Sequence, residues 1–409
     1  MIRMSTESAE MPPLLVAKGS FQVMGGAERD LMRVLPSLNR IFSVQMATIH
    51  PSQELRSLCK RENIPLICPT LPWENPTGAI SIILDTGRDT SSKAWGECEG
   101  LDEAISRTDV VHIVSGDGSL TLLDHIPQTA KVHLHLLEPH RGLYEDTLHR
   151  KVDGSPKRSL MLTRLLLSRA RRRDKALIDT NLKRGRFGVS GNSAFSAKRT
   201  SEVYGIDAGV LWPCVDASEY PSDSSQDPEN PFSGSNGDYV VSVGRASWAK
   251  GTWETISMLQ GTGLDLVHVG GGDDASLAMI RAHADSCDVG LWIAPRLPSP
   301  ELVKLMRDSR AVVSMAHAES FGLTPIEAFA VGIPALFVDE GGFRETLIDG
   351  VNGRLLPRGD YGVWHSALEQ AADGETRMEW AEAGRARIAK MDLSPDAHCH
   401  RLESILDRL

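Results

Sequence analysis

Short runs of apolar residues alternate with segments of helical spacing along most of the chain. In the first half, the apolar runs are LLVAKG, VQMATIH, PLICPT, DVVHIVSG, KVHLHLL, RFGVSG and GVLWPCVD. Each run has the length of a strand, and most are followed by a helix-like or loop segment. Strands that alternate with helices form parallel sheets with helices on both faces. The first half therefore predicts a doubly wound α/β domain.

The composition changes sharply after Asp216. The segment ASEYPSDSSQDPENPFSGSNGD is rich in Ser, Asp, Pro and Gly, which is typical of an exposed linker. The alternation then resumes with YVVSVGR, LDLVHVGGG, VGLWIAPR, RAVVSMAH, PALFVDEGG and GRLLP. With 409 residues, the chain is long for one core. We therefore expect two Rossmann-like domains, 1–217 and 237–390, joined by a linker at 218–236 and facing each other across a ligand-binding cleft.

The bulk composition is that of an ordinary soluble protein, with 41% hydrophobic and 24% charged residues. The apolar runs are far shorter than the roughly 20 residues that cross a bilayer. The start, MIRMSTESAEMPP, lacks the apolar core of a secretory signal. The six cysteines are scattered without a C-x-x-C pair, which favours reduced thiols over disulfides or a zinc site. We expect a cytoplasmic protein.

The charge is uneven along the chain. The net charge is −10, but 14 Lys and Arg face 5 Asp and Glu between Arg141 and Arg186. This basic segment suits an anionic membrane surface or a phosphorylated acceptor, and the alternative is a solvated helix face packed on its own domain. Nucleic acid is not an expected partner, because the overall balance is acidic and no aromatic residues interleave with the basic run.

Two carboxylates eight positions apart, Glu319 and Glu327, follow the run RAVVSMAH. Glu319 lies at the carboxyl end of a predicted strand. Glu327 lies in the first turn of a helix with Thr324 as its expected N-cap and Pro325 at its first position. Ligands of open α/β sheets bind at this edge, where helix N-termini favour anions. A phosphate-bearing, hydroxyl-rich ligand would use both features, although Thr324 and Glu327 could instead form a capping box.

Two cations follow another predicted strand in VSVGRASWAKG. Arg245 can donate hydrogen bonds to two phosphate oxygens, and Lys250 can act as a point charge. Together they suit a diphosphate. Gly271, in the triplet of LVHVGGGDD, and the pair Gly25 and Gly26, before a helix, would let backbone approach a ligand. Plain tight turns remain the alternative for these glycines.

The pattern E-S-F-G-L-x-P-x-E-A-x-A-x-G-x-P, followed by G-G-x-x-E and preceded by G-R-x-x-x-x-K-G, resembles the family 4 retaining glycosyltransferases, also called glycosyltransferase group 1, which have the GT-B fold. The resemblance implies that Glu319 bonds a donor sugar, Glu327 the ribose, and Arg245 and Lys250 the diphosphate. It also implies that the last helix, about 391–409, packs back on the first domain and that no metal or cofactor is needed. The further donor contacts that it implies are Gly25, Gly26, Gly271, Arg296, Leu297, Ser320, Phe321, Gly322 and Leu323.

The stretch KVHLHLLEPHRGLYED is the other candidate centre. His133 and His135 are two apart on a predicted strand and face the same side. The family has H-T-P-x-R here, but this stretch is two residues longer. We assign His135 to the transferred sugar, and His133, His140 and Arg141 to the acceptor side. A structural role in the strand is the alternative for the histidines.

These observations predict a retaining glycosyltransferase that moves a hexose from a nucleotide sugar to a hydroxyl. GDP-mannose is the favoured donor, because VSGNSAFSAKRTSEVYG and LWPCVD resemble mannose-transferring branches of the family, and UDP-glucose or another nucleotide sugar is the alternative. The acceptor is open: a phosphorylated or lipid-linked molecule, reached from the inner face of a membrane through 141–186, or a soluble one. The rival functions are a sugar phosphorylase or nucleotide-sugar epimerase of the same fold, and a non-catalytic nucleotide-sugar-binding protein.

Overall fold

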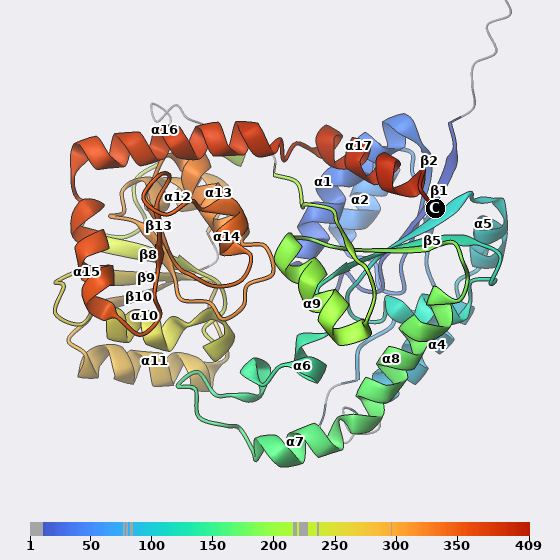
Figure 1. Ribbon diagram of the computed structural model, residues 1–409, viewed down its shortest axis with the longest axis horizontal. Helices are drawn as coiled ribbons and strands as arrows, with labels where there is room; N and C mark the ends of the chain where they lie inside the picture. Colours follow the sequence, from blue (N-terminus) through green and yellow to red (C-terminus); the bar gives the residue numbers. More distant parts are fainter. Residues whose placement is uncertain are drawn as a thin grey trace, which may run out of the picture.

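Two parallel sheets, one in each half of the chain, organise the molecule (Figure 1). The computed structural model describes residues 11–76, 78, 81, 85–215, 219–220, 228–234, 237–295 and 297–409. Neighbouring strands pair in parallel in both sheets. This arrangement confirms the predicted fold class, with two Rossmann-like α/β domains.

The first sheet has helices on both faces. Its strands are β1 (Pro13–Ala17), β2 (Ser43–Ala47), β3 (Leu66–Ile67), β4 (Val110–Val114), β5 (Lys131–Leu137), β6 (Phe187–Gly191) and β7 (Gly209–Val210), in the order β3-β2-β1-β4-β5-β6-β7. The helices are α1 (Gly26–Ile41), α2 (Gln53–Arg61), α4 (Thr86–Gly96), α5 (Leu101–Arg107), α6 (Arg141–Tyr144), α7 (Leu160–Leu166), α8 (Ser168–Leu182) and α9 (Ala194–Tyr204). Because strand side chains alternate, Leu14 and Val16 join the core that α1 and α2 cover, whereas Leu15 joins the core under α4 and α5.

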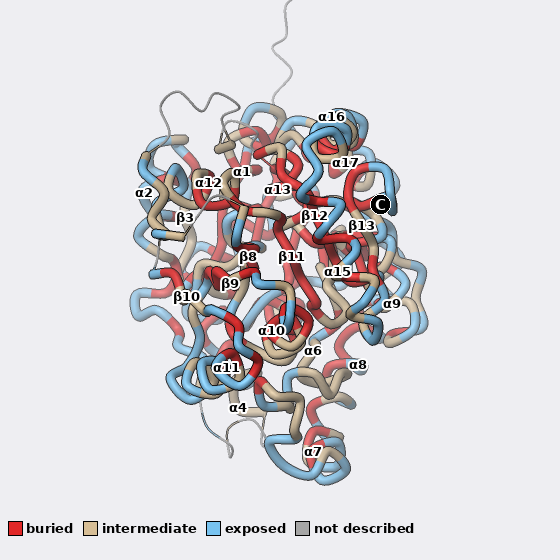
Figure 2. The backbone as a smooth tube through the Cα atoms, turned by 90° about the vertical axis from the view of Figure 1, so that its left-hand side faces the viewer, coloured by how far each residue is buried: buried red, intermediate tan, exposed pale blue. Residues whose placement is uncertain are grey.

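The second sheet repeats this layered plan around a single core. Its strands are β8 (Tyr239–Val243), β9 (Asp265–Val269), β10 (Leu291–Ala294), β11 (Val312–Ser314), β12 (Ala335–Val338) and β13 (Arg354–Leu356), in the order β10-β9-β8-β11-β12-β13. The helices are α10 (Thr252–Leu259), α11 (Asp274–Ser286), α12 (Ser299–Arg307), α13 (Leu323–Val331), α14 (Phe343–Thr346), α15 (Tyr361–Gln370) and α16 (Gly374–Met391). The central strand β11 is buried along its length, whereas peripheral α11 carries many exposed positions (Figure 2).

The chain crosses back to the first domain at its end. Helix α16 runs along the second domain, and α17 (Pro395–Leu406) lies beside α1 on the first (Figure 1). Cys399, Leu402 and Leu406 of α17 share a buried cluster with Leu31 and Val34 of α1. The first domain therefore completes one of its two cores with residues from the far end of the sequence.

The described parts of the linker differ from the exposed segment that we expected. The Phe232 ring packs 4.9 Å from the Tyr239 ring and 5.5 Å from the Trp292 ring of the second domain. Tyr220 hydrogen-bonds Glu327. The polar average composition of the segment hides these two aromatic side chains, which find apolar or polar partners on the neighbouring domain. Residues 221–227 lie outside the described residues.

The strand order reverses at one point in each sheet. In the first sheet, β2 and β4 flank β1, and in the second, β9 and β11 flank β8. Loops that leave the carboxyl ends of such strands diverge to opposite faces and form a crevice. The Gly25–Gly26 turn precedes α1, Lys250 follows β8 and Glu319 follows β11. The candidate residues therefore lie at the two switch points. No helix in the described part of the chain is long and apolar enough to cross a membrane.

Candidate active site

A lysine and a glutamate from two neighbouring loops meet at the carboxyl end of the second sheet. Lys250 ends the 3-10 turn Trp248–Lys250, and its Nζ donates to Glu319 Oε2 over 2.7 Å. Burial acts to raise the pKa of Glu319, but Lys250 and Arg141 outweigh burial and lower it. The Glu319 carboxylate is therefore charged and has an ammonium group beside it.

Close backbone packing fixes the position of Lys250. The next residue, Gly251, has φ +65°, and a Cβ atom on it would lie 2.0 Å from the Met315 carbonyl oxygen at the end of β11. A larger residue would both strain the backbone and push the loop away from β11. The glycine of the K-G pair thus sets the distance between the lysine loop and the glutamate loop.

The glycine pair of G-G-x-x-E seats the loop that carries Glu319. The backbone N–H of Gly342 donates to the Glu319 carbonyl over 2.7 Å. A Cβ atom on Gly342 would lie 2.4 Å from the carbonyl oxygen of Ser320, so a side chain has no room there. The two sequence patterns are therefore parts of one structure, in which the second holds the backbone of the first.

The last residue of the same pattern joins the two domains. Glu345 accepts hydrogen bonds from the backbone N–H of Phe195 over 3.1 Å and from Trp212 Nε1 over 3.0 Å, both in the first domain. Nearby, Asn192 Nδ2 donates to Ser320 Oγ over 3.2 Å. Sequence reasoning missed this contact between the domains, since the partners of Glu345 lie more than 130 positions earlier.

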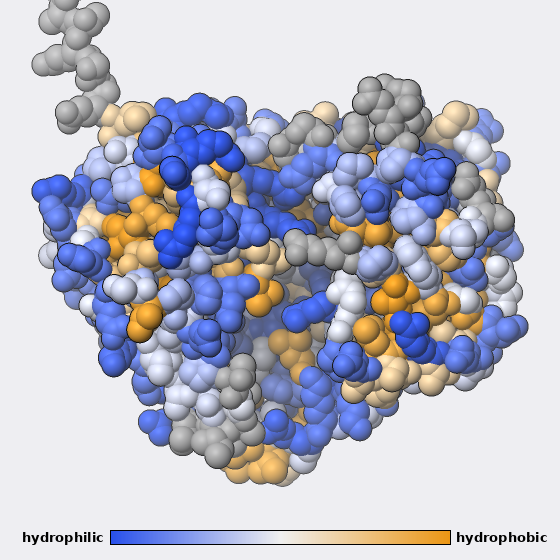
Figure 3. Space-filling view, turned by 180° about the vertical axis from the view of Figure 1, so that it is seen from behind, coloured by the Kyte–Doolittle hydropathy of each residue, from blue (hydrophilic) through white to orange (hydrophobic). Residues whose placement is uncertain are grey.

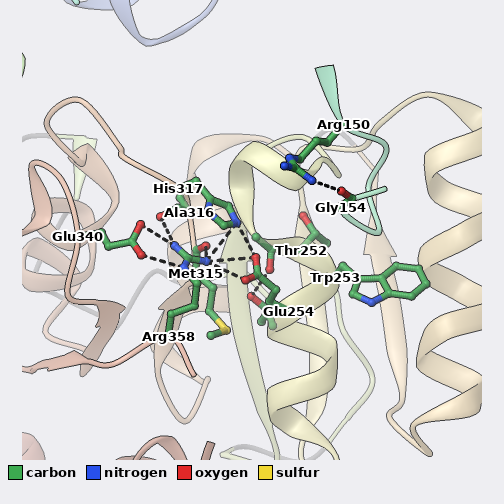
Figure 4. Close-up of polar contacts among 12 residues, drawn as sticks. Arg150, Gly154, Thr252, Trp253, Glu254, Met315, Ala316, His317, Glu340 and Arg358 are labelled. Carbon is green, nitrogen blue, oxygen red and sulfur yellow. Dashed lines mark hydrogen bonds and ion pairs between the residues drawn. The ribbon is translucent and has the colours of Figure 1, made fainter. Parts of the chain in front are cut away.

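A half-buried ion cluster braces the end of β11, before the loop that carries Glu319 (Figure 4). Arg358 donates to Glu254 over 3.0 Å, to Glu340 over 2.8 Å and to the Met315 carbonyl over 2.7 Å. His317 Nε2 lies 2.7 Å from Glu254 Oε2. Burial acts to raise the pKa of Glu340, but Arg358 outweighs it and the pKa is lowered. Sequence reasoning missed this cluster because its members come from four separate loops and helices.

Helix α13 begins earlier than predicted. Gly322, with φ +85°, is the N-cap, Leu323 is the first helical residue, and no side chain caps the helix. The expected N-cap role of Thr324 is therefore wrong, and so is the alternative of a capping box with Glu327. The partner of Glu327 is the hydroxyl of Tyr220 from the linker, and burial raises the pKa of Glu327. Glu327 is thus a buried carboxylate that already holds a hydroxyl group.

A groove of about 1050 Å³ opens between the domains, lined by α1 and α2 on one side and by the start of α12 on the other. Arg33, which lines it, donates to Glu219 Oε1 over 2.8 Å and also acts electrostatically on Glu327. Leu297, a predicted base contact, lies on the wall from the second domain. Arg296 lies outside the described residues. Further lining residues are Met24, Arg29, Gln53, Arg61, Pro298 and Leu302.

The glycine turn of the first domain faces the start of α13. A Cβ atom on Gly26 would lie 3.8 Å from Leu323 Cδ1. The N–H of Gly25 donates to Glu28 Oε2 over 2.9 Å, and Glu28 Oε1 lies 3.0 Å from the buried Lys18 Nζ. The turn is therefore held within its own domain while it lies against the other.

His133 and His135 lie in the core of the first domain and not with Glu319. His133 is 0% exposed, with Nδ1 2.9 Å from His112 Nδ1 and Nε2 3.0 Å from Ser190 Oγ. His135 is 2% exposed, and its Nδ1 lies 2.9 Å from the same hydroxyl. The shared face that we expected is present, but it points into a buried cluster. The structure therefore gives no support to the sugar and acceptor contacts predicted for these two residues.

Glu138 and Arg141 approach Glu319 instead. Leu137 has φ +55°, so the chain turns sharply at the end of β5. Arg141 Nη2 then donates to the His317 carbonyl of the second domain over 2.7 Å. Burial and the charge of Glu319 raise the pKa of Glu138 to about 7, against the opposing effect of Arg141 and Lys250. Sequence reasoning missed Glu138, although its place directly after a strand matched that of Glu319.

Three predicted residues remain open to solvent or ligand. Arg245 is exposed after β8, and within the described ranges no ion pair holds it. A Cβ atom on Gly271 would meet no atom within 4 Å. His140 is exposed at the N-cap of α6. No group of three or more His, Cys, Asp or Glu among the described residues is arranged to hold a metal ion.

The family model for glycosyl transferases group 1 matches residues 223–387, which span almost the whole second domain. The second domain is therefore similar to the group 1 glycosyltransferases. D-inositol 3-phosphate glycosyltransferase of Gordonia bronchialis is 35% identical over 140 residues, which cover 34% of this chain and 29% of the relative. Alpha-1,3/1,6-mannosyltransferase alg-2 of Neurospora crassa is 26% identical over 133 residues, which cover 32% and 28%. The chain thus spans less than a third of the length of these two curated relatives.

Solved structures extend the likeness to both domains. Anabaena Alr3699/HepE in complex with UDP and glucose has a TM-score of 0.66 at 15% identity, over 97% of this chain and 100% of that chain. Sucrose-phosphate synthase from Thermosynechococcus elongatus has a TM-score of 0.67 at 16% identity, over 97% and 98%. At these identities the likeness establishes the fold, which is the GT-B arrangement of two facing domains.

Proposed function

We propose that the protein transfers a hexose from a nucleotide sugar to an acceptor hydroxyl and retains the configuration of the sugar. The observation that carries this proposal is the Lys250–Glu319 pair, a cation and a carboxylate 2.7 Å apart at the switch point of the second sheet. A nucleotide sugar places a diphosphate directly next to a ring of hydroxyl groups. A neighbouring cation and carboxylate match that order of groups.

The charged residues take separate parts in the proposed reaction. Lys250 and Arg245 neutralise the charge that develops on the departing diphosphate. Glu319 accepts hydrogen bonds from sugar hydroxyls, and Glu327 exchanges the Tyr220 hydroxyl for a ribose hydroxyl. The bond between the anomeric carbon and the phosphate oxygen breaks while the bond to the acceptor oxygen forms on the same face. The acceptor proton passes to the leaving phosphate oxygen, and the proposal requires no metal or other cofactor.

GDP-mannose is the first donor to test, and this choice is supported by relatives named as mannosyltransferases. UDP-glucose is the second, because solved structures of the same fold contain UDP and UDP-glucose. For the acceptor, the relatives named D-inositol 3-phosphate glycosyltransferase make that phosphorylated polyol the first compound to test. The excess of cations in 141–186 suits an anionic acceptor.

The test is turnover of each nucleotide sugar, with release of nucleoside diphosphate and the mass of the product as readouts. The proposal expects a glycosylated acceptor and release that Glu319→Gln slows on the order of 100-fold. A sugar phosphorylase would leave the nucleotide sugar intact and form a sugar 1-phosphate from a glycoside and inorganic phosphate, and an epimerase would change the sugar without release. A non-catalytic binding protein would retain every donor intact, and any of these three results would contradict transfer.

A further inference from the structure

Helix α7 exposes large apolar side chains at the edge of the first domain. Met161 is 80% exposed, Leu165 69% and Leu162 49%, and we call these three residues the α7 patch. Thr163 and Leu167 on the opposite side are buried. A hydrophobic area lies at the lower edge of Figure 3, where Figure 1 places α7. The helix therefore presents apolar side chains to solvent as well as to the core of the first domain.

Exposed cations surround the α7 patch. Arg158 precedes α7, and Arg169 and Arg172 follow in the first two turns of α8. All three are exposed, and none has an acidic partner among the residues that the structure describes. The surface thus has an apolar centre and a rim of unpaired positive charge.

We propose that α7 and the start of α8 dock the protein on a membrane leaflet that contains anionic lipids. The apolar side chains would enter the acyl boundary while the arginines contact lipid phosphates, as amphipathic helices do when they lie in an interface. A second copy of the chain is the poorer occupant. In a symmetric dimer through the α7 patch, the two sets of unpaired arginines would be brought close together.

This inference does not rest on the proposed sugar transfer. The α7 patch lies apart from the Lys250–Glu319 pair, which is built on the second sheet, and it would serve any function at a membrane. If the transfer proposal holds, docking would add one property: a lipid-linked acceptor or product would be reached from the surface of its own membrane.

The test is sedimentation of the full chain with vesicles of phosphatidylcholine, alone or mixed with phosphatidylglycerol. Binding is expected with the mixed vesicles and should weaken as salt is raised. Met161→Asp with Leu165→Asp should lower the partition coefficient about tenfold or more, because two apolar side chains leave the interface. Arg169→Glu with Arg172→Glu should lower it by roughly fivefold or more for each cation. Met378→Asp, at a site on α16 that is 69% exposed, is the matched control and should bind like wild type.

Folding and the alternative occupant need separate readouts. Nucleoside diphosphate titration and circular dichroism should match between wild type and the α7 variants, and Met161→Gln with Leu165→Gln replaces the aspartate pair if that variant unfolds. Absence of binding to mixed vesicles, or equal binding by wild type and the α7 variants, would overturn the proposal. A wild-type dimer in sedimentation velocity that Met161→Asp with Leu165→Asp dissociates would assign the patch to a second copy. Donor turnover with a soluble acceptor is measured without vesicles, so the failure of one proposal does not imply the failure of the other.

Discussion

The two faces of the interdomain cleft are built in different ways. On the second domain, Lys250 and Glu319 lie in loops directly after strands and bind each other. On the first domain, the loop after β5 turns at Leu137, so that Glu138 and Arg141 approach the other domain while His135 remains in the core. The residues of the second-domain face lie after strands, and the local sequence predicts where those strands end. The other face depends on a single backbone turn and a shift in strand register.

The two domains also differ in the polar groups that lie inside them. The first domain buries four neutral histidines, His112, His133, His135 and His398. The second domain stabilises its strand ends with a charged cluster centred on Arg358. The first arrangement depends on buried imidazoles that must stay neutral, whereas the second is centred on an arginine that stays charged. Experiments that act on one and spare the other can therefore test whether the two faces are independent.

Acid should have the largest effect, and it should act on the first domain. Burial, and then the charges of the other histidines, lowers the pKa of His112, His133 and His135 well below 6.5. The unfolded chain therefore binds more protons than the native one as pH falls below about 6.5, and stability is lost in that direction. Each histidine can lower the free energy of unfolding by up to about 1.4 kcal/mol per pH unit. Together the three histidines can lower it by several kcal/mol. Hydrogen exchange from pH 7.5 to 5.5 should show the first domain opening before the second.

The pKa of His268 in the second domain is also lowered, so the stability of that domain falls with pH in the same direction but by less. His133→Gln should flatten the pH dependence of stability, and His400→Gln, at an exposed position, should leave it unchanged. An unaltered slope in His133→Gln, or earlier opening of the second domain, would show that the histidine cluster does not control acid stability.

Glu319→Gln should have the next largest effect, on catalysis. The amide keeps the shape of the side chain but loses the charge that pairs with Lys250 and would accept from sugar hydroxyls. We expect kcat to fall on the order of 100-fold while nucleoside diphosphate still binds. Steady-state rates and titration separate these two quantities. Glu382→Gln, at an exposed position on α16, is the control, and a rate equal to wild type in Glu319→Gln would remove this residue from the reaction.

Arg358→Leu tests the cluster that braces the second-domain face. The substitution leaves the carboxylates of Glu254 and Glu340 without their main partner, and we expect a loss of about 2 kcal/mol in the free energy of unfolding. Urea unfolding measures this loss. Adding Glu254→Leu should restore part of it, because one unpaired charge is then removed. No recovery in the double variant would show that Arg358 acts through packing and not through charge.

Glu138→Gln should have the smallest effect. It tests whether the first-domain face influences nucleotide affinity. The pKa of Glu138 is about 7, so the side chain gains a negative charge beside the diphosphate position as pH rises through that value. Nucleotide affinity of wild type should fall on the order of fivefold over this range. The variant should show no such fall when titrated at pH 6 and pH 8. The same fall in both proteins would place Glu138 too far from the nucleotide to act on it.

The sequence predicted the second-domain face well because its functional residues lie at the carboxyl ends of strands. Arg245, Lys250 and Glu319 each follow an apolar run within a few positions, and a parallel sheet brings such positions to one edge. The fold class followed from the same alternation of strands and helices.

Other features depend on contacts that local patterns do not record. Arg358 and Glu254 are 104 positions apart, and Trp212 and Glu345 are 133. The helix starts at Leu323 because Gly322 adopts a left-handed backbone conformation as its N-cap. The Thr324–Pro325 pattern had predicted a later start. A register shift between His135 and Leu137, where β5 pairs with β6, comes after His135 and displaces the loop that carries Glu138 and Arg141. A strand bulge moves every later side chain, so spacing alone could not place the loop that follows it.

The central claim is that the second-domain face binds the diphosphate of a nucleotide sugar through Lys250. The most direct measurement is calorimetric titration of GDP, UDP and ADP into wild type, Lys250→Ala and Lys390→Ala, the last being an exposed lysine on α16. We predict that one nucleotide is preferred and that Lys250→Ala weakens it by roughly 1.5–3 kcal/mol, while Lys390→Ala does not. Folded protein that binds no nucleotide, or that binds equally well without Lys250, would contradict the claim.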